Sequence, residues 1–312
     1  GLHGTQHGVW KNGIVLDPEL PTLARHFGAN GYQTAYIGKW HLGSGRGPVP
    51  KRERGGYDYW LGANALEAVS DAYDCVVYDQ RNRKIRLPGY RVDALTDAAI
   101  RYIDTAHQQE DPFFLFLSFL EPHHQNHLDD YPPPDGYREP YTGNWIPPDL
   151  QALGGSSAQH LGGYFGMVKR LDEALGRILD ALKSLGADRE TIVLFTSDHG
   201  CHFKTRNSEY KRSCHESSIR VPAAFSGPGF EGGGSRREIL STVDLHATLL
   251  EAAGLEVPDE LPGRSLMPRL RGRDSAWKQE AFIQISESQI GRAIRTERWK
   301  YSITAPGRKG TS

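Results

Sequence analysis

The chain contains 312 residues, of which 38% are hydrophobic and 24% are charged, and its formal net charge is −1. It therefore has no overall positive field to attract nucleic acid, and we expect no nucleic-acid partner. No apolar run approaches the roughly 20 residues that cross a bilayer, so we expect no membrane span. The length allows one large domain, alone or with a small one.

The cysteines at positions 75, 201 and 214 do not form a disulfide framework, because three cannot all pair with one another. Cys201-His202 and Cys214-His215 leave zinc binding open as an alternative. Their spacing disfavours it, since structural zinc sites usually take closely spaced ligands from each of two turns.

Hydrophobic periodicity and turn residues predict helices and strands along the first half of the chain. The expected elements are a helix over 17–30, a strand over 33–37, a hairpin of 75–78 with 84–87, a helix over 91–105 and a strand over 112–120. Two other stretches are interpreted as loops: the basic, glycine-rich residues 44–65 and the proline- and aromatic-rich residues 128–156.

The alternation continues in the second half. We expect a helix that ends at Gly186, a strand that begins at Thr191 and stops before Asp198, a strand over 220–226, a helix over 242–253 and antiparallel strands over 281–285 and 292–301. Alternating helices and strands predict a sheet with helices on both faces. An irregular stretch at 258–273 indicates a subdomain boundary.

Polar side chains follow three of the predicted strands. Lys39 and His41 come after the first, His123 after a second, and Asp198 with His199 after a third. Ligands of open α/β sheets bind at the carboxyl ends of strands, so these clusters are candidates for one site. Each cluster alone also has an ordinary structural interpretation, such as a surface lysine beside a satisfied histidine, or a turn.

Two motifs carry a family resemblance: Gly-Lys-Trp-His-Leu-Gly at 38–43 and Thr-Ser-Asp-His-Gly at 196–200. Further matching stretches lie at 20–23, 31–34, 122–123, 171–172, 210–211, 220–222, 243–245 and 263–266. Nearly the whole chain thus resembles the type I, formylglycine-dependent sulfatases of the alkaline phosphatase superfamily.

The resemblance implies an α/β fold, an alkaline-phosphatase-like α/β/α sandwich with a large mixed, mostly parallel sheet and the start of a small C-terminal antiparallel subdomain. It divides the chain into a catalytic domain over 1–272, with its N-terminal part missing, and a truncated C-terminal subdomain over 273–312.

The resemblance also implies roles for individual residues. Asp198 and His199 match ligands of a divalent cation, usually Ca²⁺, although histidine is an unusual calcium ligand. Lys39 and His41 match the pair that holds the catalytic aldehyde hydrate and the sulfate. His123 matches the histidine that assists the leaving group, with the adjacent His124 as a competitor, and Lys211 matches the lysine that grips the sulfate and the leaving-group oxygen.

One family feature is absent from the sequence. The family's nucleophile is a Cys or Ser in a Cys/Ser-x-Pro-x-Arg motif, where it becomes formylglycine, and this motif does not occur here. In the family it precedes a segment like residues 1–4 by a few positions. We therefore expect these 312 residues to be an internal, inactive fragment of a protein whose formylglycine lies upstream.

The expected function of the intact protein is hydrolysis of an organic sulfate ester. The expected substrate is a sulfated small molecule or glycan, with a carbohydrate favoured. Two alternatives stay open: a phosphodiesterase or phosphonate monoester hydrolase of the same superfamily, and a non-catalytic sulfatase-like protein that binds glycans. The resemblance suggests a periplasmic, secreted or lysosomal location, and the oligomeric state is not readable from the sequence.

Overall fold

The computed structural model describes residues 1–272 and 276–306. Its contacts group the chain into two compact units. One unit, residues 13–188, is called the large-sheet unit below. The other joins residues 1–12 to the chain from Arg189 onward and is called the split unit.

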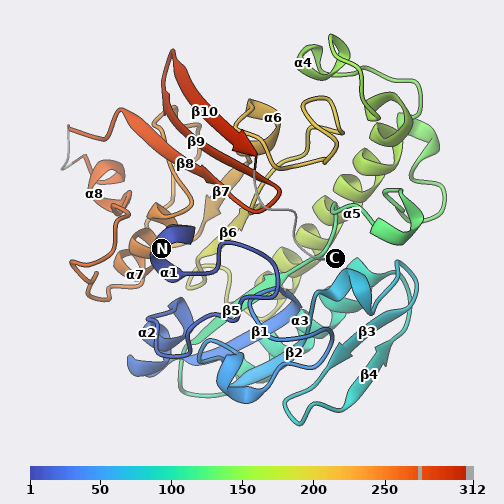
Figure 1. The fold of residues 1–312 in the computed structure, drawn as a ribbon. Helices are drawn as coiled ribbons and strands as arrows, with labels where there is room; N and C mark the ends of the chain where they lie inside the picture. The colour runs from blue at the N-terminus through green and yellow to red at the C-terminus, as the bar shows by residue number, and fades with distance from the viewer. Residues whose placement is uncertain (273–275, 307–312) are drawn as a thin grey trace. The chain divides into compact units, whose positions relative to one another are not determined.

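The large-sheet unit is built on a five-stranded mixed sheet with the strand order β4-β3-β2-β1-β5 (Figure 1). Strand β1 is flanked by β2 and β5, and both of these run parallel to it. The pairs β2–β3 and β3–β4 are antiparallel. The strands are β1 Gln33–Trp40, β2 Tyr59–Asn64, β3 Cys75–Tyr78, β4 Lys84–Leu87 and β5 Phe113–Ser118.

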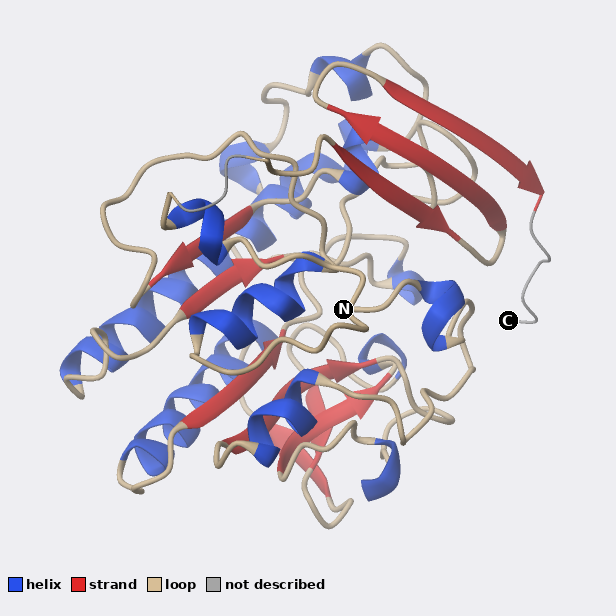
Figure 2. Cartoon of the chain, turned by 90° about the vertical axis from the view of Figure 1, so that its left-hand side faces the viewer, coloured by secondary structure: helices blue, strands red, loops and turns tan. Residues whose placement is uncertain are grey.

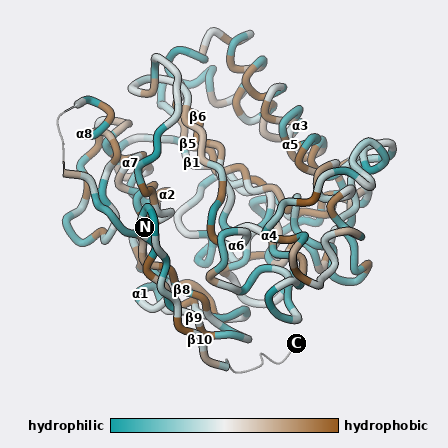
Figure 3. Tube along the Cα trace, turned by 90° about the horizontal axis from the view of Figure 1, so that it is seen from above, coloured by the Kyte–Doolittle hydropathy of each residue, from teal (hydrophilic) through white to brown (hydrophobic). Residues whose placement is uncertain are grey.

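Helices cover both faces of this sheet, because residues along β1 alternate between two apolar clusters. Ala35 and Ile37 face the helix α3, while Tyr36 and Trp40 join a second cluster with Ala24 of α2. Helix α5 packs on α3, and Figure 3 shows hydrophobic and hydrophilic stretches alternating along α3 and α5, as expected for helices with one apolar face. The helices of this unit are α2 Leu23–Ala29, α3 Arg91–His107, α4 Pro148–Gln151 and α5 Ser157–Ser184, with 3₁₀ turns η1 Lys51–Glu53, η2 Leu66–Ala68, η3 Asn126–Leu128 and η4 Glu139–Tyr141.

Gly38 lets β1 approach β5 closely. Its φ is +109°, a conformation that L side chains rarely adopt, and an added Cβ would lie 1.9 Å from the carbonyl oxygen of Ser118. Only glycine fits this position without moving the strand. The glycine of the 38–43 motif is therefore a requirement of strand packing.

The split unit holds two antiparallel sheets, shown in Figure 2. Strands β6 and β7 form a pair, and the three strands β8, β9 and β10 form a second sheet in the order β10-β9-β8. The chain start belongs here because the ring of His3 lies 5.5 Å from that of Phe282, edge to face. The elements are α1 Gly4–His7, β6 Val193–Thr196, α6 Glu216–Ile219, β7 Ala223–Ser226, α7 Asp244–Ala252, α8 Met267–Leu270, β8 Glu280–Ile285, β9 Gln289–Thr296 and β10 Lys300–Pro306.

The predicted α/β class is confirmed, with its mixed sheet, helices on both faces and small C-terminal antiparallel sheet. Several details of the prediction are wrong, among them the loop expected over 44–65, which contains β2, and the strand expected over 33–37, which continues to Trp40. The stretch expected as one strand over 292–301 contains the end of β9, a turn and the start of β10. The helix expected from 17 begins only at Leu23, where the side chain of Thr22 accepts a hydrogen bond from the Arg25 amide at 3.2 Å and caps it. The predicted division at residue 273 lies outside the described residues and stays a prediction.

Replacing Gly38 by Ala should destabilise the protein by about 3 kcal/mol or more, since strain at positive φ adds to a backbone clash. Gly28→Ala is the matched control: it lies in α2, and its added Cβ meets only a methyl group of Thr34, at 3.6 Å. That variant should gain about 0.5–1 kcal/mol, as Ala does over Gly in a helix. Urea unfolding measures the change in unfolding free energy of each variant relative to wild type. If Gly38→Ala were as stable as wild type, the close approach of β1 and β5 would be contradicted.

Candidate active site

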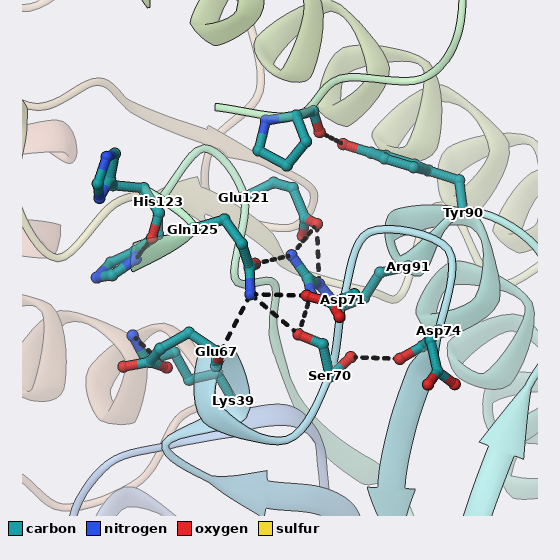
Figure 4. A network of polar contacts seen from close by, with 12 residues as sticks. Lys39, Glu67, Ser70, Asp71, Asp74, Tyr90, Arg91, Glu121, His123 and Gln125 are labelled. Carbon is teal, nitrogen blue, oxygen red and sulfur yellow. Dashed lines mark hydrogen bonds and ion pairs between the residues drawn. The ribbon is translucent and has the colours of Figure 1, made fainter. Parts of the chain in front are cut away.

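Lys39 and His41 lie at the carboxyl end of β1, and their side chains meet at one carboxylate. Lys39 Nζ lies 3.3 Å from Oε2 of Glu67 (Figure 4), and His41 Nδ1 lies 4.0 Å from its Oε1. Glu67 belongs to η2, directly after β2, and β2 pairs in parallel with β1. The strand pairing therefore brings the carboxylate to the same edge of the sheet as the two basic groups.

The Glu67 carboxylate is held ionised by its neighbours. Its side chain is only 11% exposed, so burial opposes the charge, but the nearby charges of Lys39 and His41 outweigh this and lower the pKa of Glu67. A lysine ammonium has three donors, so the pair with Glu67 can fix Lys39 while further N–H groups face a ligand. The carboxylate thus orients the two groups that the sequence predicted to bind an anion.

A buried hydrogen-bond network fixes the backbone of this region (Figure 4). Gln125, which is fully buried, donates from Nε2 to the carbonyl oxygen of Glu67 at 3.1 Å and to the Asp71 carboxylate at 3.2 Å. Its Oε1 faces Arg91 Nη2 at 3.4 Å, and Arg91 in turn pairs with Glu121 at 2.8 Å, with both charged side chains wholly buried. The network joins the segment after β2, the start of α3 and the segment after β5.

The adjacent histidines after β5 have different surroundings. His123 Nδ1 lies 2.6 Å from the carbonyl oxygen of His124, to which it donates. This assigns the Nδ1–H tautomer to the neutral His123 ring. His124 is buried, and its two ring nitrogens lie 3.1 Å and 3.0 Å from side-chain oxygens of Asn126 and Asp129. Its contacts anchor the loop, so the geometry favours His123 over His124 as the reacting histidine.

Asp198 and His199 follow β6 in the split unit. The Asp198 side chain is 83% exposed, and its Oδ2 lies 3.4 Å from Nε2 of His199. His199 Nδ1 lies 2.9 Å from the carbonyl oxygen of Gly200, to which it donates, so the neutral ring carries its unprotonated nitrogen beside the carboxylate. One carboxylate and one imidazole nitrogen fit two ligands of a divalent cation. Among residues 1–272 and 276–306, no group of three or more His, Cys, Asp or Glu side chains is arranged to hold a metal.

That finding also bears on the alternative of a zinc site. The described residues include Cys201, His202, Cys214 and His215, and they form no such group. Nor does any helix within the described ranges have both the length and the apolar character to cross a membrane.

Lys211 belongs to the split unit, where its Nζ lies 5.4 Å from the centroid of the Tyr210 ring. The predicted site residues therefore form two groups, each defined within its own unit. Lys39, His41 and His123 lie in the large-sheet unit, and Asp198, His199 and Lys211 lie in the split unit.

Sequence reasoning missed Glu67 because it missed β2. Residues 44–65 were expected to be loop, yet Tyr59–Asn64 is a buried strand. A weak signal was present: Tyr59, Trp60 and Leu61 form a short apolar run, and Asn64 and Glu67 follow it. Gln125 and Arg91 carried no such local signal, since their roles depend on contacts between distant parts of the chain.

Glu67→Gln should lower the free energy of unfolding by about 3 kcal/mol at neutral pH, because it leaves the buried charge of Lys39 without its partner. The pKa of Glu67 is lower in the folded state than its usual 4.5. Its stabilisation is therefore present above that value and is lost as pH falls through the folded pKa. Urea unfolding between pH 7 and pH 3 should show that the difference in unfolding free energy between Glu67→Gln and wild type becomes smaller as the pH falls.

The exposed Glu19→Gln is the control and should change the free energy of unfolding by less than about 0.5 kcal/mol at neutral pH. A constant difference across the range would contradict the ion pair.

Comparison with known proteins identifies the family. A family model described as Sulfatase matches residues 1–255, and one described as N-sulphoglucosamine sulphohydrolase, C-terminal, matches residues 208–303. The ulvan-active sulfatase of Formosa agariphila is 30% identical over 98% of this chain, and human arylsulfatase K is 24% identical over 96%. The chain spans 62% of the length of each of these relatives.

Solved structures share the fold. A Bacteroides thetaiotaomicron structure, described under the metabolism of multiple glycosaminoglycans, has a TM-score of 0.82 at 22% identity and covers 99% of this chain and 73% of its own. Another, described as a complex with its substrate D-glucosamine-2-N,6-O-disulfate, has a TM-score of 0.71 at 22% identity, over 96% of this chain and 76% of its own. With most of its length matched by the family model, the chain belongs to the sulfatase family.

Proposed function

We propose that the whole protein is a sulfuric ester hydrolase that removes sulfate from a carbohydrate. The observation that carries the proposal is the convergence of Lys39 and His41 on Glu67 at the carboxyl end of β1, in a chain of the sulfatase family. Oriented donors at a strand end suit an anionic group whose negative charge grows as an S–O bond breaks. Because Glu67 fixes both groups in advance, they need little rearrangement when the sulfate binds.

In this proposal the large-sheet unit binds the sulfate and handles a proton. Lys39 and His41 donate hydrogen bonds to sulfate oxygens and orient the ester. His123, in its cationic form with a proton on each ring nitrogen, gives its Nε2 proton to the departing alcohol oxygen, while its Nδ1 keeps the hydrogen bond to the His124 carbonyl oxygen that fixes the ring. His124 holds the loop in place through Asn126 and Asp129.

The split unit contributes a cation site and a further positive charge. Asp198 and His199 would hold a divalent cation, for which we propose Ca²⁺ because a carboxylate is a hard oxygen ligand. When bound, the cation would neutralise charge on the sulfate oxygens. Lys211 binds a sulfate oxygen and the leaving-group oxygen. The nucleophile is proposed to be a formylglycine outside these 312 residues, which would supply an aldehyde-hydrate hydroxyl for attack on sulfur.

A sulfated carbohydrate is the proposed substrate class. Two similar proteins are described by carbohydrates: one as ulvan-active, and one in complex with a disulfated glucosamine. We propose a periplasmic, secreted or lysosomal location on the family resemblance. The division into a catalytic domain over 1–272 and a C-terminal subdomain from 273 also stands as part of this proposal.

The test uses the full-length protein with sulfated oligosaccharides, and with phosphate diesters and phosphonate monoesters as competing substrates. Turnover should be confined to the sulfate esters, and Lys211→Ala should lower kcat/KM by at least about a hundredfold, as loss of a charge-stabilising donor does. Lys84→Ala, in the exposed β4 strand, is the control and should leave kcat/KM unchanged. Preference for phosphoryl esters would replace the proposal with a phosphoryl hydrolase. Sulfated-glycan binding without turnover would favour a non-catalytic protein.

The adjacent histidines provide a second test in the same protein. His123→Gln should reduce kcat by about a hundredfold or more on alkyl sulfates and much less on activated aryl sulfates, because only a poor leaving group needs the proton. Its Tm should stay at the wild-type value. His124→Gln should instead lower Tm by several degrees, since it removes the hydrogen bonds by which this buried side chain holds Asn126 and Asp129. If His124→Gln alone produced the dependence on the leaving group, the two roles would have to be exchanged.

A further inference from the structure

A cleft of about 540 Å³ lies in the large-sheet unit between the sheet and α3. Its lining includes Gln33 and Thr34 at the start of β1, Asp58 and Tyr59 at the start of β2, and Arg101 and Tyr102 of α3. This volume is typical of small-ligand sites, whose volumes are about 300–1,000 Å³. All the named residues belong to a single unit of the chain.

The cleft contains polar groups that the protein itself leaves unsatisfied. Tyr102 is 9% exposed, and its buried hydroxyl has no hydrogen-bond partner within residues 1–272 and 276–306. Leaving a buried hydroxyl unpaired is costly, about 1–3 kcal/mol, so most such groups in folded proteins find a partner. Arg101 is exposed, and its guanidinium makes no hydrogen bond or ion pair with any residue that the structure describes, so it can pair with a ligand in the cleft. The Tyr102 hydroxyl and the Arg101 guanidinium are therefore two hydrogen-bond donors in one cleft that can bind an acceptor on a ligand.

The other residues that line the cleft determine which ligand would fit. The rings of Tyr59 and Tyr102 lie 4.8 Å apart at a tilt of 45° and provide flat apolar surface. Burial, with smaller contributions from Tyr59 and Asp58, raises the pKa of Tyr102 to about 12, so its hydroxyl remains a donor at neutral pH. The Asp58 carboxylate accepts a hydrogen bond from Thr34 at 3.1 Å and keeps lone pairs for a ligand hydroxyl.

The cleft is remote from the candidate active site. Thr34 and Lys39 lie on the same strand five residues apart, which places them roughly 16 Å from each other at about 3.3 Å per residue. The cleft opens at the amino ends of β1 and β2, whereas Lys39 and Glu67 lie at their carboxyl ends. A ligand in the cleft would therefore be a second, separately bound group.

We propose that this cleft binds a pyranose sugar that carries one anionic group. Arg101 pairs with the anion, since a guanidinium forms two parallel hydrogen bonds with a carboxylate or a sulfate. The Tyr59 and Tyr102 rings contact the apolar face of the sugar, and the Tyr102 hydroxyl donates to a ring substituent. Asp58 accepts from a sugar hydroxyl and repels a second anionic group, so a densely sulfated unit is excluded.

The test measures binding to the intact protein by saturation-transfer NMR, with sodium glucuronate, glucose 6-sulfate and glucose as probes. At least one anionic sugar should bind in the millimolar range, and glucose about tenfold more weakly. The probe that binds tells whether the anion is a carboxylate, a sulfate or either. No turnover is measured, so failure of the proposed hydrolase activity would leave this result unaffected.

Two variants separate the cleft from other sites for the same probes. Arg101→Gln should weaken binding of the anionic sugar about tenfold, while Arg81→Gln, in the exposed hairpin turn, should not. Tyr102→Phe removes a hydroxyl that has no internal partner, so its Tm should equal or exceed that of wild type while its affinity falls severalfold. Absence of binding for both anionic sugars would overturn the proposal, as would unchanged affinity in the Arg101 and Tyr102 variants.

Discussion

A wholly buried ion pair between Arg91 and Glu121 is the interaction on which the large-sheet unit most depends. Removing two charges from water costs several kcal/mol for each, and their attraction offsets this only when further hydrogen bonds satisfy both groups. Here Arg91 also donates to the carbonyl oxygen of Ser70 at 2.9 Å and reaches Gln125, whereas Oε2 of Glu121 has no hydrogen-bond partner among the described residues. The pair forms only when the start of α3, the segment after β5 and the segment after β2 come together. Formation of this ion pair therefore requires the same arrangement of segments that brings the candidate-site residues of this unit together.

The candidate site depends on this network through one amide side chain. Gln125 holds the backbone of Glu67, and the Glu67 carboxylate holds Lys39 and His41. The groups proposed to bind the sulfate are thus fixed by buried contacts behind them, before any ligand arrives. Preorganisation of this kind lets donors stabilise developing charge without reorganising during the reaction. Loss of a buried contact in this series should therefore displace Lys39 and His41 even where the altered residue does not touch either of them.

Much of the fold was readable from the sequence, because long periodic segments and the β3–β4 hairpin carry local signals. The failures have physical causes. Gly38 suggested the end of a strand, but it continues β1 because the carbonyl of Ser118 leaves no room for a Cβ. Residues 44–65 were predicted to be a loop because they are basic and glycine-rich. Strand β2 was therefore missed, and Glu67, which follows it, was missed as well. The roles assigned to Asp198 and Lys211 came from motif resemblance, while the contacts of Gln125 arise only from tertiary packing.

Strand β1 connects these features because it is the strand with a parallel neighbour on each side. Its backbone is hydrogen-bonded along both edges, and aromatic stacking fixes its position: the rings of Tyr36 and Trp60 lie 5.1 Å apart, and those of Tyr36 and Phe116 lie 5.4 Å apart. Parallel neighbours also align their ends, so polar residues after β1, β2 and β5 reach the same edge. The residues at the amino ends of β1 and β2 lie at the opposite edge and line the cleft that we propose for an anionic sugar. A rigid central strand can therefore carry a reactive site at one end and a binding site at the other, with a fixed separation between them.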